Sequence, residues 1–379
     1  MGNHILKERA MFHPYEIAFC GLSGSGKTTL MTEVIRHFRL KGHEPASFKH
    51  GCHHFDIDWE SKDSFRFRQA GAVSVLISDP VKEAIISDGP GSLSNTPVLL
   101  SSDMLFIEGL KELEIPKLLL VDAEREILPM MEMGTVSQVL ALVHDGNADG
   151  LDSYGLPLFC RNDVAGVAGF IERCFAQRAA AIPLFGLVLA GGLSSRMGTD
   201  KALLSYHAGN QLVTTAALLS DKCDKVFISC RQEQAETYSG YGHPIITDCY
   251  LGMGPMGGLL SAQRSHPDSA WLVTACDLPF VEADTIASLL SSRDPFRFAT
   301  AFTSPGSKLP EPLLTIYEPK TRQALLQQHA SGNDSLSSFL RHSRILSTES
   351  NAPSTLRNVN DPASMAEVKE VLKECKGKC

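Results

Sequence analysis

The stretch Gly21–Thr28, GLSGSGKT, decides the fold of the first half of the chain. It fits the phosphate-binding pattern G-x-x-x-x-G-K-[ST] at every fixed position. An apolar run at residues 17–20 precedes it, and a stretch with Leu30, Val34 and Phe38 on one helical face follows it. A strand, a glycine-rich turn and a helix in this order are the context that the pattern needs. We therefore predict an α/β domain whose loop binds phosphate.

Each part of this loop has a predicted task. Consecutive backbone N–H groups curl around the β-phosphate at the start of the helix, Lys27 reaches the β and γ oxygens, and the Thr28 hydroxyl ligates magnesium. The apolar run at residues 104–107 ends in Glu108, which is predicted to face the loop on its magnesium side. This pattern predicts phosphate binding but not hydrolysis. A loop that binds phosphate hydrolyses the nucleotide slowly unless other residues position the attacking water and an arginine stabilises the developing charge.

A second strand–turn–helix unit follows at residues 187–204, LVLAGGLSSRMGTDKALL. Its lysine lies several residues beyond the glycines, which makes the loop more open. Such a loop, carrying Arg196 and Lys201, can wrap a whole triphosphate and neutralise a departing pyrophosphate, as attack at the α-phosphorus requires. The apolar strand at residues 271–275 leads into Asp277. We predict that Asp277 ligates magnesium, because ligands of open α/β sheets collect at the carboxyl ends of strands.

Length and composition agree with two folded domains. The chain has 379 residues, 43% hydrophobic and 21% charged, which is too long for one ordinary domain and is typical of globular protein. A short, small-residue segment ending at Pro183 marks the boundary, so we expect domains at 14–176 and 183–375. Apolar runs alternate with helical or turn segments in both halves and predict α/β domains with largely parallel sheets. The expected strands lie at residues 46–49, 73–78, 104–107, 118–121, 139–143, 226–229, 271–275, 298–302 and 313–317.

Charge and cysteine usage limit the partners and the location. The net charge of −8 provides no basic field, so nucleic acid and anionic membrane are not expected partners. The ten cysteines show no C-x-x-C spacing and are expected to be thiols in a reducing compartment. No apolar run approaches the length of a membrane span. We therefore expect a cytoplasmic protein.

The first half resembles a known family. Besides the loop, the segments Lys49-His50, Ser61–Ser64, Gln69–Ala72 and Phe106–Gly109 resemble the B proteins of molybdopterin-guanine dinucleotide biosynthesis, over most of residues 14–175. The resemblance implies a P-loop NTPase-like domain that acts as a GTP-binding adaptor with little catalytic power of its own. The GTP ligands that we predict on this basis are Gly21, Ser23, Gly24, Ser25, Gly26, Lys27, Thr28, Thr29 and Glu108, with Thr28 also on the metal.

The second half is similar to the nucleotidyltransferases, most closely to the molybdenum cofactor guanylyltransferases, over residues 184–374. Its matching segments are Leu189–Gly192, Arg196–Gly198, Asp200-Lys201, Gly254-Pro255, Cys276–Pro279 and Asn358–Asn360. The resemblance implies a Rossmann-like domain in which Arg196, Lys201 and Asp277 are catalytic and Asp277 binds Mg²⁺. The implied GTP ligands are Leu189, Ala190, Gly191, Gly192, Lys201, Ser229, Asp248 and Asp277, and the implied pterin contacts are Gly258, Asn358 and Asn360.

Taken together, the two resemblances imply a fusion that transfers GMP from Mg-GTP to the terminal phosphate of molybdopterin and releases pyrophosphate. The implied partners are GTP and molybdopterin, with molybdoenzyme apoproteins or cofactor insertion factors as protein partners. Three alternatives stay open: a cytidylyl or sugar-phosphate transferase, a GTP-dependent delivery protein without catalysis, and a first half that is itself an active GTPase or kinase. The histidine-rich stretch His50–Asp58 is either a polar loop near the nucleotide or a metal site.

Overall fold

The computed structural model describes residues 13–50, 58–60, 62–87, 97–191, 201–204, 210–303, 309–350, 353–357 and 359. The chain divides into two compact units, Met1–Arg173 and Cys174–Cys379. The two domains expected at 14–176 and 183–375 stay a prediction in their exact bounds.

The first unit is built on a six-stranded sheet in the order β2-β5-β1-β6-β7-β8, and every neighbouring pair is parallel. Its strands are β1 (Glu16–Cys20), β2 (Pro45–Lys49), β5 (Met104–Glu108), β6 (Lys117–Leu120), β7 (Val139–His144) and β8 (Leu158–Cys160). The central strands β1, β5 and β6 are buried along their whole length, as unbroken apolar runs in a parallel sheet predict. The strand order reverses beside β1, and in open α/β sheets ligands bind at such a switch point.

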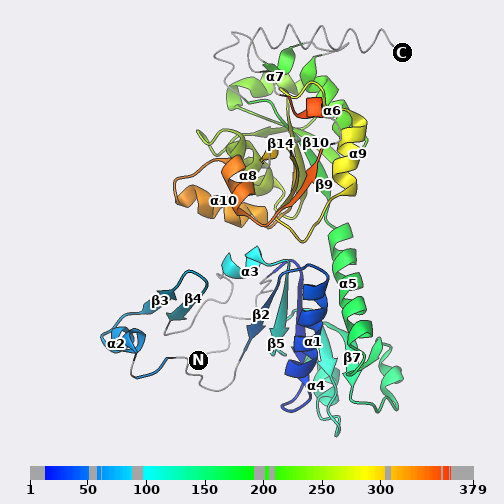
Figure 1. Cartoon of the computed structure of the whole chain (residues 1–379). Helices are drawn as coiled ribbons and strands as arrows, with labels where there is room; N and C mark the ends of the chain where they lie inside the picture. The colour runs from blue at the N-terminus through cyan, green and yellow to red at the C-terminus, as the bar shows by residue number, and fades with distance from the viewer. Residues whose placement is uncertain are drawn as a thin grey trace. The chain divides into compact units, whose positions relative to one another are not determined.

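Helices connect these strands, and α1 lies along the sheet (Figure 1). Leu30, Met31, Val34 and Phe38 are its buried residues, so the apolar face expected from the sequence packs on the sheet. The helices of this unit are α1 (Lys27–Leu40), α2 (Asp63–Gln69), α3 (Pro97–Ser101) and α4 (Leu128–Glu132). Helix α5 (Val164–Ala180) begins in this unit and ends in the second.

One expected strand forms, but it belongs to a different sheet from the one predicted. Residues 73–78 were expected in the parallel sheet, but β3 (Ser74–Ser78) pairs antiparallel with β4 (Glu83–Ser87) in a separate two-stranded sheet. Only Val75 is buried in β3, whereas a central strand of a parallel sheet is buried on both faces. An apolar run of this length does not reveal by itself which sheet the strand will join.

The second unit has a seven-stranded sheet in the order β11-β10-β9-β12-β14-β13-β15. Strands β9 to β12 are parallel, whereas β14 runs antiparallel to both β12 and β13. The sheet is therefore mixed: it is largely parallel, as expected, and β14 is its antiparallel strand. Its strands are β9 (Leu184–Leu189), β10 (Lys225–Cys230), β11 (Ile245–Thr247), β12 (Ala270–Ala275), β13 (Ala299–Thr303), β14 (Pro310–Tyr317) and β15 (Leu346–Glu349).

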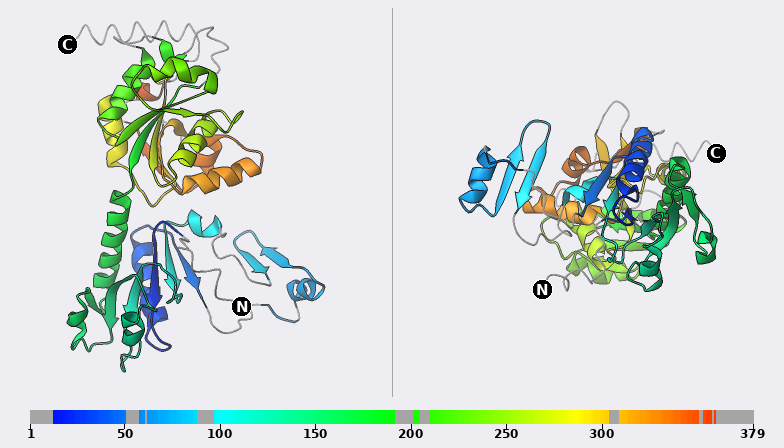
Figure 2. Two further views of the ribbon diagram at one scale, coloured as in Figure 1. Left: turned by 180° about the vertical axis from the view of Figure 1, so that it is seen from behind. Right: turned by 90° about the horizontal axis from the view of Figure 1, so that it is seen from below.

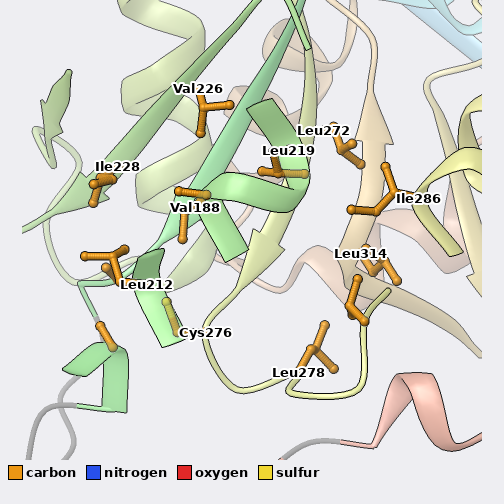
Figure 3. Close-up of a cluster of buried hydrophobic side chains, with 14 of the residues drawn as sticks. Val188, Leu212, Leu219, Val226, Ile228, Leu272, Cys276, Leu278, Ile286 and Leu314 are labelled. Carbon is orange, nitrogen blue, oxygen red and sulfur yellow. The ribbon is translucent and has the colours of Figure 1, made fainter. Parts of the chain in front are cut away.

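Helices cover both faces of this sheet and create two cores (Figures 1 and 2). Val188 points into the core beneath α6 and α9, shown in Figure 3, while its neighbour Leu187 points into the core beneath α8, α10 and α11. Adjacent residues of a strand face opposite sides of a sheet, so one apolar strand supplies both cores. The helices are α6 (Gln211–Ser220), α7 (Ala235–Ser239), α8 (Pro255–Ser265), α9 (Ala283–Ser291), α10 (Thr321–Ala330) and α11 (Leu336–His342).

Helix α5 extends further than the sequence predicts. The segment expected as a short linker is helical up to Ala180, because α5 continues past Phe175. The helix expected to begin at Asp361 lies outside the described residues. Within the described part of the chain, no helix has both the length and the apolar character that crossing a membrane requires.

Candidate functional site

The glycine-rich loop connects the end of β1 at Cys20 with the start of α1 at Lys27. Gly24 has a φ of 79° and Gly26 a φ of 87°, which is the left-handed region that favours glycine. A side chain at Gly26 would also collide, since a Cβ there would lie 2.7 Å from Cδ of Arg161. Both conformation and space therefore require glycine in this loop.

Thr28 and Glu108 meet beside the loop although they come from different elements. The Thr28 hydroxyl, on α1, donates to the Glu108 carboxylate at the end of β5 over 2.9 Å. Lys49 Nζ, at the end of β2, lies 3.3 Å from Glu108 Oε1. The structure thus brings together the hydroxyl and the carboxylate that the sequence assigned to the magnesium side. Their oxygens are of the kind that Mg²⁺ prefers.

Lys27 is folded back onto its own loop. Its ammonium donates to the Leu22 carbonyl over 2.6 Å. Burial lowers the pKa of Lys27, and the nearby Glu108 carboxylate opposes that effect. Ser23, Ser25 and Thr29 lie in the same loop and first helical turn, so all the residues predicted around the phosphates are adjacent.

Sequence reasoning missed Arg161, which follows β8. Its Nη1 donates to the Ser25 carbonyl over 3.1 Å, and its backbone N–H donates to the His144 carbonyl over 2.8 Å. Arg161 belongs to no motif, and it comes far later in the chain than the loop. Only the order of strands in the sheet brings it there.

The second unit contains a cavity of about 580 Å³ at the carboxyl ends of its parallel strands. The predicted residues Leu189, Ala190, Gly191, Ser229, Asp248, Gly258 and Asp277 all line it. The remaining lining residues are Ala202, Arg231, Tyr250, Leu251, Gly252, Gly254, Pro255, Ala275, Cys276 and Leu313. Ligands of open α/β sheets bind at such an edge.

One wall of this cavity is built from Ser229, Asp248 and two glycines. The Ser229 hydroxyl donates to Asp248 Oδ1 over 2.7 Å. A Cβ at Gly258 would lie 2.7 Å from both Ser229 Oγ and Leu189 Cδ2, and a Cβ at Gly191 would lie 3.0 Å from Asp248 Oδ2. Burial raises the pKa of Asp248, while the Ser229 hydroxyl and the charge of Arg231 lower it. The wall is polar and closely packed, with no room for side chains at the glycines.

Asp277 lies on the opposite side of the strand ends, directly after β12. Thr274 pairs with Leu314 in the antiparallel β12–β14 ladder, so continuing this register places Asp277 opposite Glu311. Burial raises the pKa of Glu311, and the negative charge of Asp277 raises it further. The sequence did not reveal Glu311, because the expected strand began at residue 313.

Val359, which lies late in the chain, contacts the backbone of Asp277. Its N–H donates to the Asp277 carbonyl over 2.9 Å. The flanking Asn358 and Asn360, which were predicted to contact the pterin, lie outside the described residues. The same holds for Gly192, Arg196 and residues 51–57 of the histidine-rich stretch, and nothing is described of the Lys201 side chain.

The described ends of the histidine-rich stretch have other partners. His50 donates its N–H to the Glu108 carbonyl over 3.0 Å. Asp58 accepts a hydrogen bond from Ser64 Oγ over 2.7 Å and lies 3.5 Å from Nη1 of Arg68. Within the described part of the chain, no three His, Cys, Asp or Glu side chains are grouped in a way that could hold a metal ion.

Comparison with known proteins identifies both units. The family model for molybdopterin guanine dinucleotide synthesis protein B matches residues 16–145, and the model for the MobA-like NTP transferase domain matches residues 186–348. The molybdopterin-guanine dinucleotide biosynthesis adapter protein of Escherichia coli is 31% identical over 162 residues, which cover 41% of this chain and 90% of that protein. The chain belongs to the molybdopterin guanine dinucleotide synthesis protein B family, with a MobA-like NTP transferase domain as its second unit.

Other relatives match one half or the other. A molybdenum cofactor biosynthesis bifunctional protein of Synechocystis is 36% identical over 141 residues, 37% of this chain and 41% of that protein. The chain thus matches about two fifths of the length of this curated relative. The molybdenum cofactor guanylyltransferase of Shewanella sediminis is 24% identical over 195 residues, covering 51% of this chain and 98% of that protein.

Two solved structures are also similar to parts of the chain. Molybdopterin-guanine dinucleotide biosynthesis protein A of Archaeoglobus fulgidus is 22% identical, with a TM-score of 0.41, and covers 50% of this chain and 99% of that one. A molybdopterin-guanine biosynthesis protein B is 26% identical, with a TM-score of 0.33, and covers 42% of this chain and 99% of that one. The sheets of the two units confirm the expected α/β fold with two domains.

Proposed function

We propose that the MobA-like unit transfers GMP from Mg-GTP to the terminal phosphate of molybdopterin, giving molybdopterin guanine dinucleotide and pyrophosphate. We propose that the P-loop unit binds a second GTP as an adaptor. The observation that carries the transferase proposal is the cavity of about 580 Å³, which gathers Ala190, Gly191, Asp248 and Asp277 at the strand ends. The match to the MobA-like domain over residues 186–348 and the names of its relatives support the same activity.

The guanine base is proposed to lie against the wall formed by Ser229 and Asp248. An ionised carboxylate accepts hydrogen bonds from the N1–H and 2-amino groups of guanine, and the Ser229 hydroxyl holds Asp248 Oδ1 in place. Leu189 and Gly191 would line the nucleotide. Cytosine has no N–H donor at N3, so this wall favours guanine over cytosine.

The reacting phosphates are proposed to lie near Asp277. Its carboxylate, opposite Glu311, offers hard oxygen donors that fit Mg²⁺. When bound, Mg²⁺ would neutralise charge on the phosphates. Arg196, Lys201 and Gly192 stay predicted contacts to the triphosphate, and Arg196 and Lys201 would stabilise the departing pyrophosphate.

The attacking group needs no general base. The terminal phosphate of molybdopterin is already ionised at neutral pH, so catalysis reduces to alignment and charge neutralisation. Asn358, Asn360 and Gly258 are proposed to hold the pterin substrate. The hydrogen bond from Val359 to Asp277 supports this, because it ties the chain between the two asparagines to the residue at the reacting phosphates.

In the P-loop unit, Lys27 is proposed to exchange its bond to Leu22 for the β and γ oxygens of GTP. Gly21, Ser23, Gly24, Ser25, Gly26 and Thr29 would form the remainder of the cradle. Thr28 and Glu108 would hold Mg²⁺ beside the loop, since the Thr28 hydroxyl and the Glu108 carboxylate already meet there. The proposed protein partners are molybdoenzyme apoproteins or cofactor insertion factors.

A cytoplasmic location is part of the proposal. Burial raises the pKa of Cys20 to about 11 and that of Cys223 to about 12, so both thiols stay protonated and inert near neutral pH. Such thiols are consistent with a reducing compartment.

The test is incubation of the purified protein with molybdenum-loaded molybdopterin, Mg²⁺ and either GTP or CTP, followed by chromatographic identification of the product. We expect a GMP adduct, and a loss of at least a hundredfold in rate for Asp277→Asn with GTP binding retained. Asp284→Asn, an exposed acid in the first turn of α9, is the matched control and should keep the wild-type rate.

The other outcomes separate the alternatives. A CMP adduct would keep the mechanism and overturn the base assignment. Nucleotide binding without any adduct would favour a delivery protein. In a parallel incubation, a sugar phosphate replaces molybdopterin, and an adduct formed only there would favour a sugar-phosphate transferase.

A further inference from the structure

Lys49 lies beside the phosphate-binding loop and has no task in the proposed function. It is the last residue of β2, and Glu108 is the last residue of β5. The two strands are parallel, and their register pairs Lys49 directly with Glu108. Glu108 in turn pairs with Phe19 of β1, the strand that leads into the loop. The strand ends therefore bring the ammonium of Lys49 to the side of the loop where Thr28 and Glu108 meet.

The ends of β2 and β5 stay in contact beyond the last pair of the ladder. The N–H of His50 donates to the Glu108 carbonyl over 3.0 Å. Gly109 has a φ of 102°, and a Cβ there would lie only 3.2 Å from the His50 carbonyl oxygen. The backbone at Lys49 is thus held against the backbone at Glu108. A change of partner for Lys49 needs only its side chain to move.

The side chains of Glu108 and Lys49 are held to different degrees. The Glu108 side chain is 10% exposed, and both of its carboxylate oxygens lie 2.9 Å from the Thr28 hydroxyl. The Lys49 side chain is 66% exposed, and its ammonium lies 3.3 Å from Glu108 Oε1. Water screens an ion pair in which one partner is exposed, so the pair contributes little to stability. Lys49 can therefore leave Glu108 at little cost.

The charge of Lys49 acts on the part of the loop that would hold the phosphates. Burial lowers the pKa of Lys27, the Glu108 carboxylate opposes this effect, and the positive charges of Lys49 and Lys111 lower the pKa further. Lys27 is predicted to reach the β and γ oxygens of the nucleotide. A charge that repels the Lys27 ammonium from this distance attracts phosphate oxygens at the same place.

Binding of a nucleoside triphosphate would change the partner of Lys49. In the proposed function Glu108 gives its carboxylate to Mg²⁺, and the Lys49 ammonium, being of the same sign as the metal, loses its counter-ion. The metal of a P-loop bridges oxygens of the β- and γ-phosphates. The γ-phosphate would therefore lie on the Glu108 side of the loop, within the reach of the flexible lysine stem. A nucleoside diphosphate offers no phosphate there.

We propose that Lys49 senses the γ-phosphate of the nucleotide in the P-loop. Its ammonium pairs with Glu108 when the loop is empty and with γ-phosphate oxygens when a nucleoside triphosphate is bound. This rests on the proposed binding of GTP by the P-loop unit. The backbone N–H groups of the loop contact the β-phosphate, which a diphosphate also has. Lys49 adds a contact that only a triphosphate makes, so it raises the preference of the unit for GTP over GDP.

The test compares a triphosphate with a diphosphate at the same site. Binding of radiolabelled GDP and of GMPPNP, an analogue of GTP that resists hydrolysis, is measured with Mg²⁺ by equilibrium dialysis on the full-length chain. Each variant is also measured with Lys27→Ala added, and the binding that Lys27→Ala removes is assigned to the P-loop. In Lys49→Met, which keeps the stem and removes the charge, we expect GMPPNP to bind at least tenfold more weakly and GDP less than threefold more weakly.

Two further variants separate a contact with the γ-phosphate from a general attraction. Lys111→Met removes another positive charge that acts on Lys27, but the Lys111 ammonium lies 3.9 Å from the sulfur of Met130. It should weaken GMPPNP and GDP by similar factors and keep their ratio. Lys49→Arg restores a cation at the end of β2 and should recover most of the preference for GMPPNP. Circular dichroism of each variant establishes that it is folded.

The outcomes distinguish this proposal from the one on which it rests. An unchanged ratio of GMPPNP to GDP affinity in folded Lys49→Met would overturn the sensor while leaving nucleotide binding by the P-loop intact. An equal fall of this ratio in Lys111→Met would also overturn it, because the preference would then come from the summed charge. If Lys27→Ala removed no binding of either nucleotide, the proposed function of the P-loop unit would fail, and the sensor with it.

Discussion

At the scale of single residues, Asp248 illustrates a conflict between stability and binding. Its carboxylate is held by Ser229 in the wall of the transferase cavity, where burial raises its pKa. Accepting hydrogen bonds from guanine needs the charged form, but burial favours the neutral form. The charged form of Asp248, which is proposed to bind the base, therefore lowers the stability of the fold.

We predict that Asp248→Asn raises the melting temperature of the MobA-like unit near neutral pH. The folded state of the wild type binds the Asp248 proton more tightly than the unfolded state does, so stability decreases as pH rises through the raised pKa. The neutral amide of Asp248→Asn removes this loss of stability. The increase in melting temperature should become smaller as pH falls toward the ordinary pKa range of an aspartate. Differential scanning calorimetry at several pH values measures the difference.

The same variant should bind GTP in the transferase unit at least tenfold more weakly, because an amide does not accept from both guanine donors. Ser229→Ala provides the comparison, since it removes the hydroxyl contact and keeps the charge. A variant that gained stability and kept its full affinity for GTP would contradict the role proposed for Asp248.

At the scale of elements, α6 shows how one helix fixes the sheet beneath the cavity. Leu212, Ala216 and Leu219 are fully buried and pack into the core with Val188 and Ile228 (Figure 3). The Asn210 side chain caps the helix by accepting from the Val213 N–H over 2.9 Å. The cap sets where the helix starts, and the buried face sets how it lies on β9 and β10.

We predict that Leu219→Ala destabilises the MobA-like unit by about 2–5 kcal/mol, the usual range for truncating a buried leucine. Val213→Ala, at a position on the same helix that is 42% exposed, should change the stability by less than about 0.5 kcal/mol. Urea titration followed by circular dichroism compares the two. Equal effects at both positions would show that this face of α6 does not support the core.

The elements also show what a sequence can and cannot reveal. The strands at residues 104–107 and 118–121 are confirmed because apolar runs bounded by turns identify buried strands. The strand at residues 46–49 is confirmed as well, although none of its residues is buried. Which strands pair with each other depends instead on the fold of the whole chain. For this reason the antiparallel β14, the separate β3–β4 sheet, and the positions of Arg161 and Glu311 could not be predicted. The residues placed by motif, such as Thr28 and Asp277, carry a local signal, whereas Arg161 and Glu311 depend on strand order.

At the scale of the whole molecule, the two proposed nucleotide sites of the chain differ in design. The P-loop unit has a closed backbone cradle at the start of α1, whereas the MobA-like unit has a wide cavity over several strand ends. A tight cradle suits binding of a β-phosphate, and an open one leaves room for a second substrate.

We predict that the full-length chain binds two GTP molecules and that Lys27→Ala binds one. The remaining site should still support GMP transfer, because Lys27 belongs to the other unit. Equilibrium dialysis gives the stoichiometry, and the chromatographic assay gives the transfer. Loss of both nucleotides in Lys27→Ala would show that the sites are not separate.

Helix α5 has a consequence for protein engineering. It runs without a break from Val164 to Ala180, while the chain divides after Arg173. Splitting the gene at that division would leave less than two turns of helix on the second fragment, too few to stand alone. Splitting it after Pro183 would instead detach Phe175, which is buried and makes an edge-to-face contact with the ring of Phe296, from the second fragment. Either breakpoint exposes apolar surface, so the two activities should be separated by point substitutions in the intact gene rather than by expressing halves.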